Sequence, residues 1–157
     1  MREVGVTPNV FSFSAAISAC EKGGKWERAL SLLEEMRVVG VAPNVMSFSA
    51  AISACEKGGK WERARALLEE MREVGVAPNV ISFNAAISAC EKGGKWERAL
   101  SLLEEMRERD VTPNVISFSA AIFACWQGGK WENALSLLED MREVGVCLLY
   151  TSPSPRD

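Results

Sequence analysis

The chain has 157 residues, of which 48% are hydrophobic, and its formal net charge at pH 7 is −3. This apolar fraction is typical of a folded domain with a packed core and excludes a disordered chain. The small net charge excludes both a polybasic nucleic-acid tail and an acidic solvating tail, so any charged site must come from local arrangement.

One sequence block, PNVxSFxAAIxACxxGGKWExA, occurs four times at a spacing of 35 residues and starts at Pro8, Pro43, Pro78 and Pro113. A period of about 20 to 50 residues is typical of a solenoid, in which each unit stacks on its neighbours because it cannot bury its apolar face alone. We therefore expect the end of a truncated repeat at residues 1–9, followed by repeats 1 to 4 at residues 10–44, 45–79, 80–114 and 115–146.

Each repeat begins with the pattern of an amphipathic helix, here called helix A, which covers roughly residues 11–22 in repeat 1. Its apolar positions follow the i, i+3, i+4, i+7 stripe of a helix that faces a core. They are Phe13, Ala16, Ile17 and Cys20. Gly23 and Gly24 then end the helix, because paired glycines disfavour a helix interior.

A second stripe predicts helix B, which runs from Trp26 to about Gly40 and is closed off by Pro43. Its apolar positions are Trp26, Ala29, Leu30, Leu33 and Met36. The short glycine connection leaves room only for an antiparallel pair of helices. We expect an all-α fold, an α-solenoid of antiparallel helix hairpins that forms a right-handed superhelix with a concave surface.

Repeat 2 departs from its siblings at Arg65, which stands where the other repeats carry leucine. This position lies at the edge of the helix B stripe, and Glu69 is four residues further on. An Arg65–Glu69 ion pair would contribute about 0.3 to 0.5 kcal/mol, while the arginine stem covers apolar surface. We expect this substitution to be tolerated rather than functional.

Helix A carries a second organised face, because positions 11, 14, 18 and 22 lie within about 80° of one another and opposite the core stripe. Across the repeats this face forms three rows. The apolar row is Phe11, Met46, Ile81 and Ile116, the small polar row is Ser14, Ser49 and Asn84, and the lysine row is Lys22, Lys57 and Lys92. Such rows suit single-stranded nucleic acid, since apolar side chains stack on bases, short polar groups bond base edges and lysines meet phosphates. The alternative is ordinary packing between repeats with solvated lysines.

The 35-residue unit, its SFxAAI opening, the ALSLLEEM stretch of helix B and the VGVxPN exit resemble the pentatricopeptide repeat, a relative of the 34-residue tetratricopeptide repeat. The likeness covers residues 1 to about 146. It implies a protein that binds single-stranded RNA with one base per repeat and acts in RNA processing, stability, editing or translation. It also implies a location in the mitochondrion or chloroplast.

The resemblance assigns roles to single residues. Base reading falls to Ser14 with Asn44, Ser49 with Asn79, and Asn84 with Asn114. These pairs imply a preference for 5′-A-A-(C/U)-3′. The apolar row matches residues that sandwich bases, and the lysine row matches a position that contacts the phosphate backbone. Asparagine after proline is also an ordinary turn or N-cap residue, so both interpretations of the asparagines stay open.

Repeat 4 departs from the pattern on this same face. Phe123, Trp126 and Gln127 replace serine, glutamate and lysine, and Ser119 has no asparagine partner at the end of its repeat. We therefore expect weaker RNA reading by repeat 4 than by the others.

Four cysteines, Cys20, Cys55, Cys90 and Cys125, occupy one repeat position, and Cys147 follows the last repeat. Neighbouring helix pairs lie roughly 10 Å apart, beyond the disulfide Cα limit of about 7 Å. We expect reduced core thiols in an intracellular protein, with no bound metal or cofactor because CxxC spacing and histidine are absent.

Catalysis is not expected, since the chain has no histidine and no cluster of acid and base groups. No apolar run approaches the roughly 20 residues that span a bilayer. The predicted partner is single-stranded RNA, bound by a monomer. The competing prediction is a protein-binding scaffold of the tetratricopeptide kind, in which the concave face holds a peptide.

Both ends of the chain interrupt the repeat. Met1 lies inside a repeat, so a targeting segment ahead of it is compatible with the pattern. After Val146 the expected proline and asparagine do not follow, and residues 147–157 resemble a translated sequencing adapter. We expect this tail to be non-native.

Overall fold

The computed structural model describes residues 8–149, with side chains from 8 to 144. Within this range the chain forms helices and no strand, which confirms the all-α prediction. The A helices are α1 (Val10–Lys22), α3 (Val45–Lys57), α5 (Val80–Lys92) and α7 (Val115–Gln127). The B helices are α2 (Trp26–Val38), α4 (Trp61–Glu73), α6 (Trp96–Glu108) and α8 (Trp131–Leu149). Most of the expected tail, residues 150–157, and residues 1–7 of the truncated repeat lie outside the described residues.

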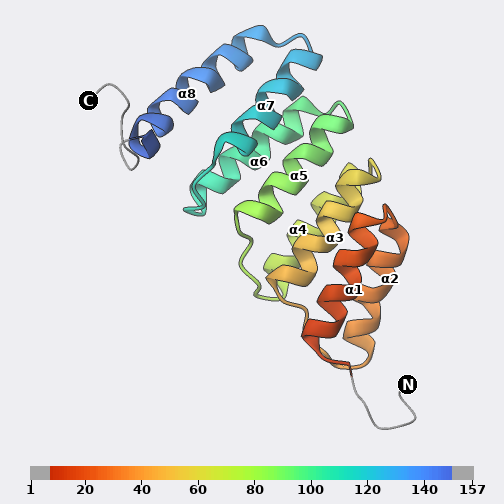
Figure 1. Cartoon of the computed structure of the whole chain (residues 1–157). Helices are drawn as coiled ribbons and strands as arrows, with labels where there is room; N and C mark the ends of the chain where they lie inside the picture. Colours follow the sequence, from red (N-terminus) through yellow and green to blue (C-terminus); the bar gives the residue numbers. More distant parts are fainter. Residues whose placement is uncertain (1–7, 150–157) are drawn as a thin grey trace.

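The helices form two layers that run from α1 and α2 at one end of the array to α7 and α8 at the other (Figure 1). Successive A helices pack directly on one another, and each B helix packs against its own A helix. The B helices α2, α4 and α6 also contact the A helix of the following repeat. The predicted solenoid of antiparallel hairpins is therefore confirmed. No helix in the described part of the chain combines the length and apolarity that membrane crossing needs.

A reciprocal capping box starts each A helix. In repeat 2 the Ser47 amide donates to Asn44 Oδ1 over 3.0 Å, and the Asn44 amide donates to Ser47 Oγ over 2.8 Å. These bonds satisfy amides that a helix start otherwise leaves unpaired. The helix ends at a glycine pair, whose second member Gly59 adopts φ +72°, a left-handed angle that favours glycine. Sequence reasoning placed the helix A start one residue late, at residue 11 rather than Val10.

The core lies between the two layers and repeats with the sequence. Phe48, Ile52 and Cys55 of α3 have no exposed surface, and Met71 of α4 closes the same core from the other layer. This burial confirms the predicted stripe of helix A, and in helix B it confirms Ala29, Leu33 and Met36, whereas Trp26 and Leu30 are half-buried. Helix B ends at Val38, two residues before the expected Gly40, because Gly40 turns the chain with φ +83°.

A tryptophan links each repeat to the next. Trp26 of α2 packs on Gly58 of the following repeat, where a Cβ atom would lie 2.6 Å from Trp26 Cδ1. The Lys60 ammonium lies 5.1 Å from the centroid of the same indole, a cation–π contact. The contact recurs twice, with Trp61 on Gly93 and Lys95, and with Trp96 on Gly128 and Lys130. We call each Gly-Gly-Lys surface that receives an indole a tryptophan seat.

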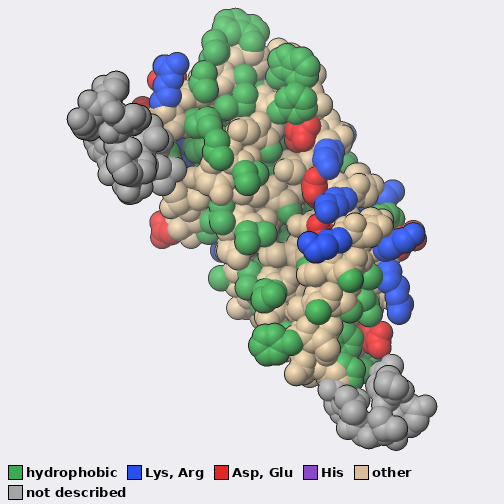
Figure 2. All heavy atoms as spheres, in the orientation of Figure 1, with side chains coloured by type: hydrophobic (Ala, Val, Ile, Leu, Met, Phe, Trp, Pro, Cys, Tyr) green, Lys and Arg blue, Asp and Glu red, His purple; other side chains and the backbone are tan. Residues whose placement is uncertain are grey.

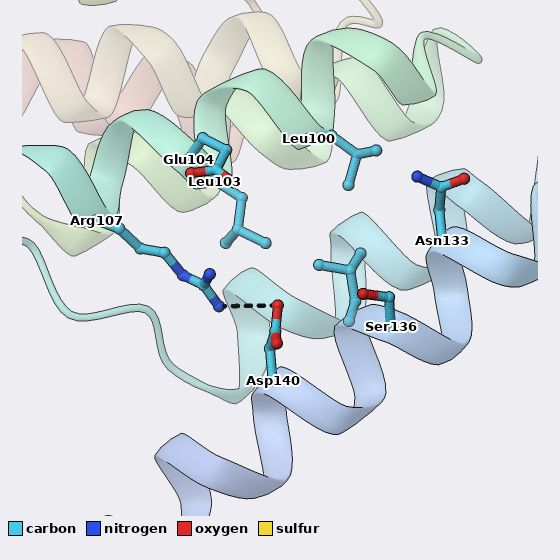
Figure 3. Close-up of a pocket in the computed structure, with 8 residues that line it drawn as sticks. Leu100, Leu103, Glu104, Arg107, Asn133, Ser136 and Asp140 are labelled. Atoms are coloured by element: carbon cyan, nitrogen blue, oxygen red, sulfur yellow. Dashed lines mark ion pairs between the residues drawn. The ribbon is translucent and has the colours of Figure 1, made fainter.

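The B helices are joined by ion pairs instead of close packing. Arg107 of α6 pairs with Asp140 of α8 at 3.4 Å, beside a groove of about 160 Å³ (Figure 3). In Figure 3, Leu100 and Leu103 from α6 face Asn133 and Ser136 from α8. The equivalent pairs in the earlier repeats are Arg37–Glu70 and Arg72–Glu105.

Arg65 lies in the corresponding space between α4 and α6. It lines a groove of only about 10 Å³ there, in the position that Leu100 holds in the larger groove. The predicted Arg65–Glu69 pair is wrong, because Glu69 pairs with Arg72 at 3.2 Å instead. The arginine stem therefore acts by covering apolar surface, as its length allows.

Candidate nucleic-acid interface

The apolar row lies at the start of the A helices and is open to solvent. Phe11 is 71% exposed, and Met46, Ile81 and Ile116 are 55–59% exposed. Each residue occupies the second helical position after the capping asparagine, from which its side chain projects away from the core between the layers. Figure 2 shows separate apolar side chains spaced over the face that the A helices form. The row is therefore available to stack on flat ligands.

The small polar row does not lie on an open face, which corrects the sequence-based placement. Ser14, Ser49 and Asn84 are only 3–8% exposed. The reason is the close packing of successive A helices, which places these residues at the contact between neighbouring repeats. Their predicted part in base reading stays a prediction.

Asn84 shows how this row meets the next repeat. Its Nδ2 donates to Asn114 Oδ1 over 3.0 Å, and its Oδ1 accepts a hydrogen bond from Ser117 Oγ. The two residues of the third predicted base-reading pair are thus bonded to each other. By contrast, Ser14 Oγ and Ser49 Oγ have no hydrogen-bond partner within residues 8–149. A buried hydroxyl without a partner is costly, so these two groups gain most from an added polar ligand.

The asparagines that follow proline are helix caps. Asn79 Oδ1 accepts from the Ser82 amide over 3.0 Å, and Asn114 Oδ1 accepts from the amides of Ile116 and Ser117 at 3.1 Å. The capping interpretation of these residues is confirmed. It leaves the asparagine Nδ2 groups as the donors that a base edge would meet.

Two members of the lysine row, Lys57 and Lys92, are paired with glutamates that sequence reasoning did not assign to the site. Lys57 Nζ of α3 lies 2.6 Å from Glu21 Oε2 of α1, and Lys92 of α5 pairs in the same way with Glu56 of α3. The hydrogen bond to Glu21 raises the pKa of Lys57 above its ordinary value. Figure 2 shows basic and acidic side chains alternating along the edge where the A helices end. A phosphate would compete there with carboxylates.

The pattern changes at α7. Phe123 and Trp126 stack with ring centroids 5.1 Å apart and are 46% and 66% exposed. Gln127 replaces the lysine that would pair with Glu91, and burial raises the pKa of that carboxyl. This end of the face is aromatic where the other repeats are charged.

The repeat cysteines are free thiols, as predicted, and Cys147 lies outside the described side chains. Burial raises the pKa of both Cys55 and Cys90 to about 11, so these groups stay neutral and unreactive at physiological pH. In the described part of the chain, no group of three or more histidine, cysteine, aspartate or glutamate residues is placed to hold a metal ion.

Two features of this face escaped the sequence reasoning. The only sequence signal for the Lys57–Glu21 pair is the Glu-Lys dipeptide that ends each A helix in repeats 1 to 3. The role of Gly58 as a seat for Trp26 has no local signal, since a glycine pair after a helix is explained by the turn alone.

Comparison with known families gives matches along almost the whole chain. The family model for the pentatricopeptide repeat domain matches residues 1–58, 31–93, 66–127 and 101–147. A comparison with proteins of curated function found no match.

Solved structures with the same fold include proteins bound to RNA. One is the pentatricopeptide repeat protein PPR10 in complex with an 18-nt psaJ RNA element, with 32% identity and a TM-score of 0.77. The match covers 90% of this chain and 20% of that chain, so the chain spans about a fifth of its relative. Maize PPR10 matches with 25% identity and a TM-score of 0.53, over 92% of this chain and 26% of that one.

The repeat domain of Arabidopsis thaliana protein-only RNase P 1, in complex with tRNA, has a TM-score of 0.80. Its identity is 18%, over 99% of this chain and 79% of that chain, and this likeness concerns the fold alone.

Proposed function

The chain belongs to the pentatricopeptide repeat family, and we propose that it binds single-stranded RNA along the face formed by its A helices. The observation that carries this proposal is the apolar row, in which an exposed apolar side chain recurs at one position of four successive A helices. The exposed side chains of Phe11, Met46, Ile81 and Ile116 offer apolar contact surface at a regular spacing, and bases offer flat surfaces with which such side chains stack.

Each base sits between neighbouring members of the apolar row in this proposal, and its edge meets the polar residues at the junction of two repeats. The unpaired hydroxyls of Ser14 and Ser49 favour repeats 1 and 2 as the stronger readers. Asn84 and Asn114 must open their mutual hydrogen bond before repeat 3 reads a base. The implied preference is 5′-A-A-(C/U)-3′, with one base per repeat.

The expected affinity is modest. Stacking contributes about 1 to 3 kcal/mol per base, so three reading repeats supply about 3 to 9 kcal/mol before ordering costs. A micromolar complex needs about 8 kcal/mol. RNA processing or stabilisation in the mitochondrion or chloroplast is the cellular role that we propose for an array of this kind.

Titration of the full chain with fluorescent A-rich, U-rich and duplex oligonucleotides tests the proposal. We expect binding confined to single strands and weakened by salt. Replacing Phe11, Met46 and Ile81 by alanine removes stacking and is expected to reduce affinity about tenfold or more. Unchanged affinity in this triple variant would refute binding along the apolar row.

Charge variants separate the lysine row from general electrostatics. Lys22, Lys57 and Lys92 changed to glutamate are expected to weaken binding, whereas the same change in charge on the outer layer is expected to have less effect. The matched control is Arg28, Arg63 and Arg98 changed to glutamate, all exposed on B helices. Equal losses in both triple variants would contradict a phosphate track on the A helices.

The ion pairs offer a test with a gain of affinity. Glu21→Gln and Glu56→Gln release Lys57 and Lys92 from their carboxylate partners. If these lysines contact phosphates, the double variant binds RNA more tightly and shows a steeper salt dependence. A weaker or unchanged affinity would remove the lysine row from the RNA site.

A protein-binding scaffold is the second candidate. Two observations favour it. Lys57 and Lys92 are already paired with glutamates, which weakens their attraction for phosphate. The Phe123–Trp126 pair is exposed, and aromatic side chains are enriched at protein interfaces. Failure of every single-stranded oligonucleotide to bind would leave the scaffold as the better account.

A further inference from the structure

A series of ion pairs along the A helices stops between α5 and α7. Lysines at the ends of α3 and α5 each reach back to a glutamate at the end of the preceding A helix, in the pairs Lys57–Glu21 and Lys92–Glu56. The next pair would join Glu91 of α5 to residue 127 of α7, where the chain carries glutamine. Since α7 packs on α5 as the earlier A helices pack on one another, Gln127 lies where that lysine would be.

Glu91 is therefore a half-buried carboxylate without a cation. It makes no ion pair within residues 8–144. Burial raises the pKa of this carboxyl, and Lys92, which is paired with Glu56, opposes that effect without cancelling it. A cation brought to Glu91 would gain more than one brought to Glu21 or Glu56, which already have partners.

An aromatic ring lies one helical turn before Gln127. Phe123 of α7 is 46% exposed, and Trp126 stacks on it with ring centroids 5.1 Å apart and an angle of 23° between the ring planes. The first three repeats carry serine at the position of Phe123, and each of these serines is half-buried although another repeat follows it. Partial exposure is thus a property of this repeat position, and phenylalanine extends further from it than serine does.

The free face of the Phe123 ring lies on the side of α5. Around α7, Trp126 is about 60° to one side of Phe123 and Gln127 is about 40° to the other. The position of Gln127 is the one from which lysines reach the preceding A helix in the earlier repeats. Trp126 therefore covers the ring face that points away from α5. Figure 2 shows an acidic side chain directly beside the exposed rings at this edge.

The chain itself shows which cation fits between a phenyl ring and a carboxylate. The Arg107 guanidinium carbon lies 5.5 Å from the centroid of the Phe118 ring, and its Nη2 lies 3.4 Å from Asp140 Oδ2. A guanidinium is planar, so it stacks on a ring while its N–H groups donate to a carboxylate. Glu91 and Phe123 offer the same two groups with no arginine of the described chain paired to the carboxylate.

We propose that Glu91, Phe123 and Gln127 form a binding site for an arginine side chain of a protein partner. The guanidinium stacks on the free face of Phe123 and donates hydrogen bonds to the Glu91 carboxylate, and the side-chain oxygen of Gln127 accepts a further one. The site is formed by α5 and α7 alone. It goes beyond the RNA binding proposed above and does not depend on it.

An NMR titration of the full chain with the peptide acetyl-Gly-Arg-Gly-amide tests the site. We expect weak, saturable binding, with chemical-shift changes confined to the ends of α5 and α7. The matched peptide with citrulline keeps the planar group and loses its charge, so it should bind at least about fivefold more weakly. The lysine peptide keeps the charge and loses the planar group, and it should also bind more weakly.

Gln127→Lys is the most specific variant. It restores the residue that the earlier repeats carry, and its own ammonium should occupy Glu91, so the fold is kept while affinity for the arginine peptide falls about tenfold or more. Glu91→Gln and Phe123→Ser should each weaken binding about fivefold or more. The matched control is Glu21→Gln, since that carboxylate is already held by Lys57 and its loss should leave peptide affinity unchanged.

Three results would each overturn the proposal. The first is an arginine peptide that does not bind, or that binds no better than the citrulline peptide. The second is unchanged affinity in Gln127→Lys or Glu91→Gln, because the peptide would then bind elsewhere. The third is a single-stranded oligonucleotide that shifts the resonances of Phe123 and Glu91 when the arginine peptide does not, which would assign the aromatic pair to RNA.

Discussion

The inner layer of A helices and the outer layer of B helices come from the same repeat but are joined by different forces. Successive A helices meet through alanine, serine and cysteine side chains that are almost fully buried, as Ala51, Ala54 and Cys55 show. Successive B helices meet through ion pairs such as Arg107–Asp140 and leave grooves between them. Close packing fixes distances, whereas exposed ion pairs tolerate adjustment. The inner layer therefore sets the spacing of the candidate RNA face, and we expect the outer layer to be the more adjustable of the two.

The largest loss is expected from a core residue of the inner layer. Phe83 of α5 has no exposed surface, and Phe83→Ala should lower the free energy of unfolding by about 3 to 5 kcal/mol through lost burial and a residual cavity. Urea unfolding followed by circular dichroism measures this change. Phe123→Ala on α7 is the control, since this exposed ring should cost about 0.5 kcal/mol or less. Equal losses of stability in the two variants would show that the Phe123 ring is buried in solution.

The contact between repeats is tested by a single methyl group. Gly93 has φ −84°, so alanine fits its backbone, but the Cβ atom would lie 2.6 Å from Trp61 Cδ1. Gly93→Ala should destabilise the protein by about 1 to 3 kcal/mol, as overpacking does elsewhere. Gly23→Ala is the control and should leave the unfolding free energy nearly unchanged, because a Cβ atom there would meet nothing closer than Ala19 O at 3.4 Å. An unchanged stability for Gly93→Ala would mean that Trp61 rotates away without cost.

Helix capping separates the layers again, because every A helix has a side-chain cap whereas α2, α4 and α6 have none. Asn79 caps α5, whereas Lys60 and Lys95 at the starts of α4 and α6 make no side-chain capping bond. Asn79→Ala should cost about 0.5 to 2 kcal/mol. Asn133→Ala, an exposed asparagine on α8, is the control and should cost less. A harmless Asn79→Ala that nevertheless lowers RNA affinity would favour base reading as the main role of this residue.

The helices and their core were predictable because the signals are local. Apolar periodicity, the glycine pair and the proline act within one helix or turn, and they placed helix A within one residue of its start at Val10. The stripe of Phe13 and Ile17 points to the core whatever the neighbouring repeat does. The same reasoning identified the capping alternative for Asn44 from its place after a proline.

The burial of the small polar row was not predictable in this way. The angle of Ser14 around its own helix says nothing about how closely the next A helix approaches, and that distance decides whether the side chain is exposed. The Lys57–Glu21 pair has the same origin, since its two residues are brought together by the register between neighbouring helices. Contacts between repeats can be predicted only when the packing of successive repeats is known. Contacts within a repeat can be predicted from the sequence of that repeat alone.

In the outer layer, a double-mutant cycle measures how little an exposed ion pair contributes. Arg107 and Asp140 are about one-third exposed and lie 3.4 Å apart. Their coupling free energy, from Arg107→Ala, Asp140→Ala and the double variant, should be about 0.2 to 1 kcal/mol and should fall as salt is added. A coupling of several kcal/mol would make the outer layer as rigid as the inner one and would contradict the comparison.

Arg65→Leu is expected to have the smallest effect. Leucine occupies this position in the other repeats, and Leu100 lines a groove of about 160 Å³ between α6 and α8, whereas Arg65 lines a groove of about 10 Å³ between α4 and α6. The substitution replaces the apolar stem of arginine by the apolar side chain of leucine. The free energy of unfolding, measured with urea, should therefore change by no more than about 0.5 kcal/mol. A loss clearly above 1 kcal/mol would show that the arginine holds α4 and α6 together. The distance between α4 and α6 would then be fixed by the arginine side chain that lies between them. The adjustability expected of the outer layer would apply to the α6–α8 contact but not to the α4–α6 contact.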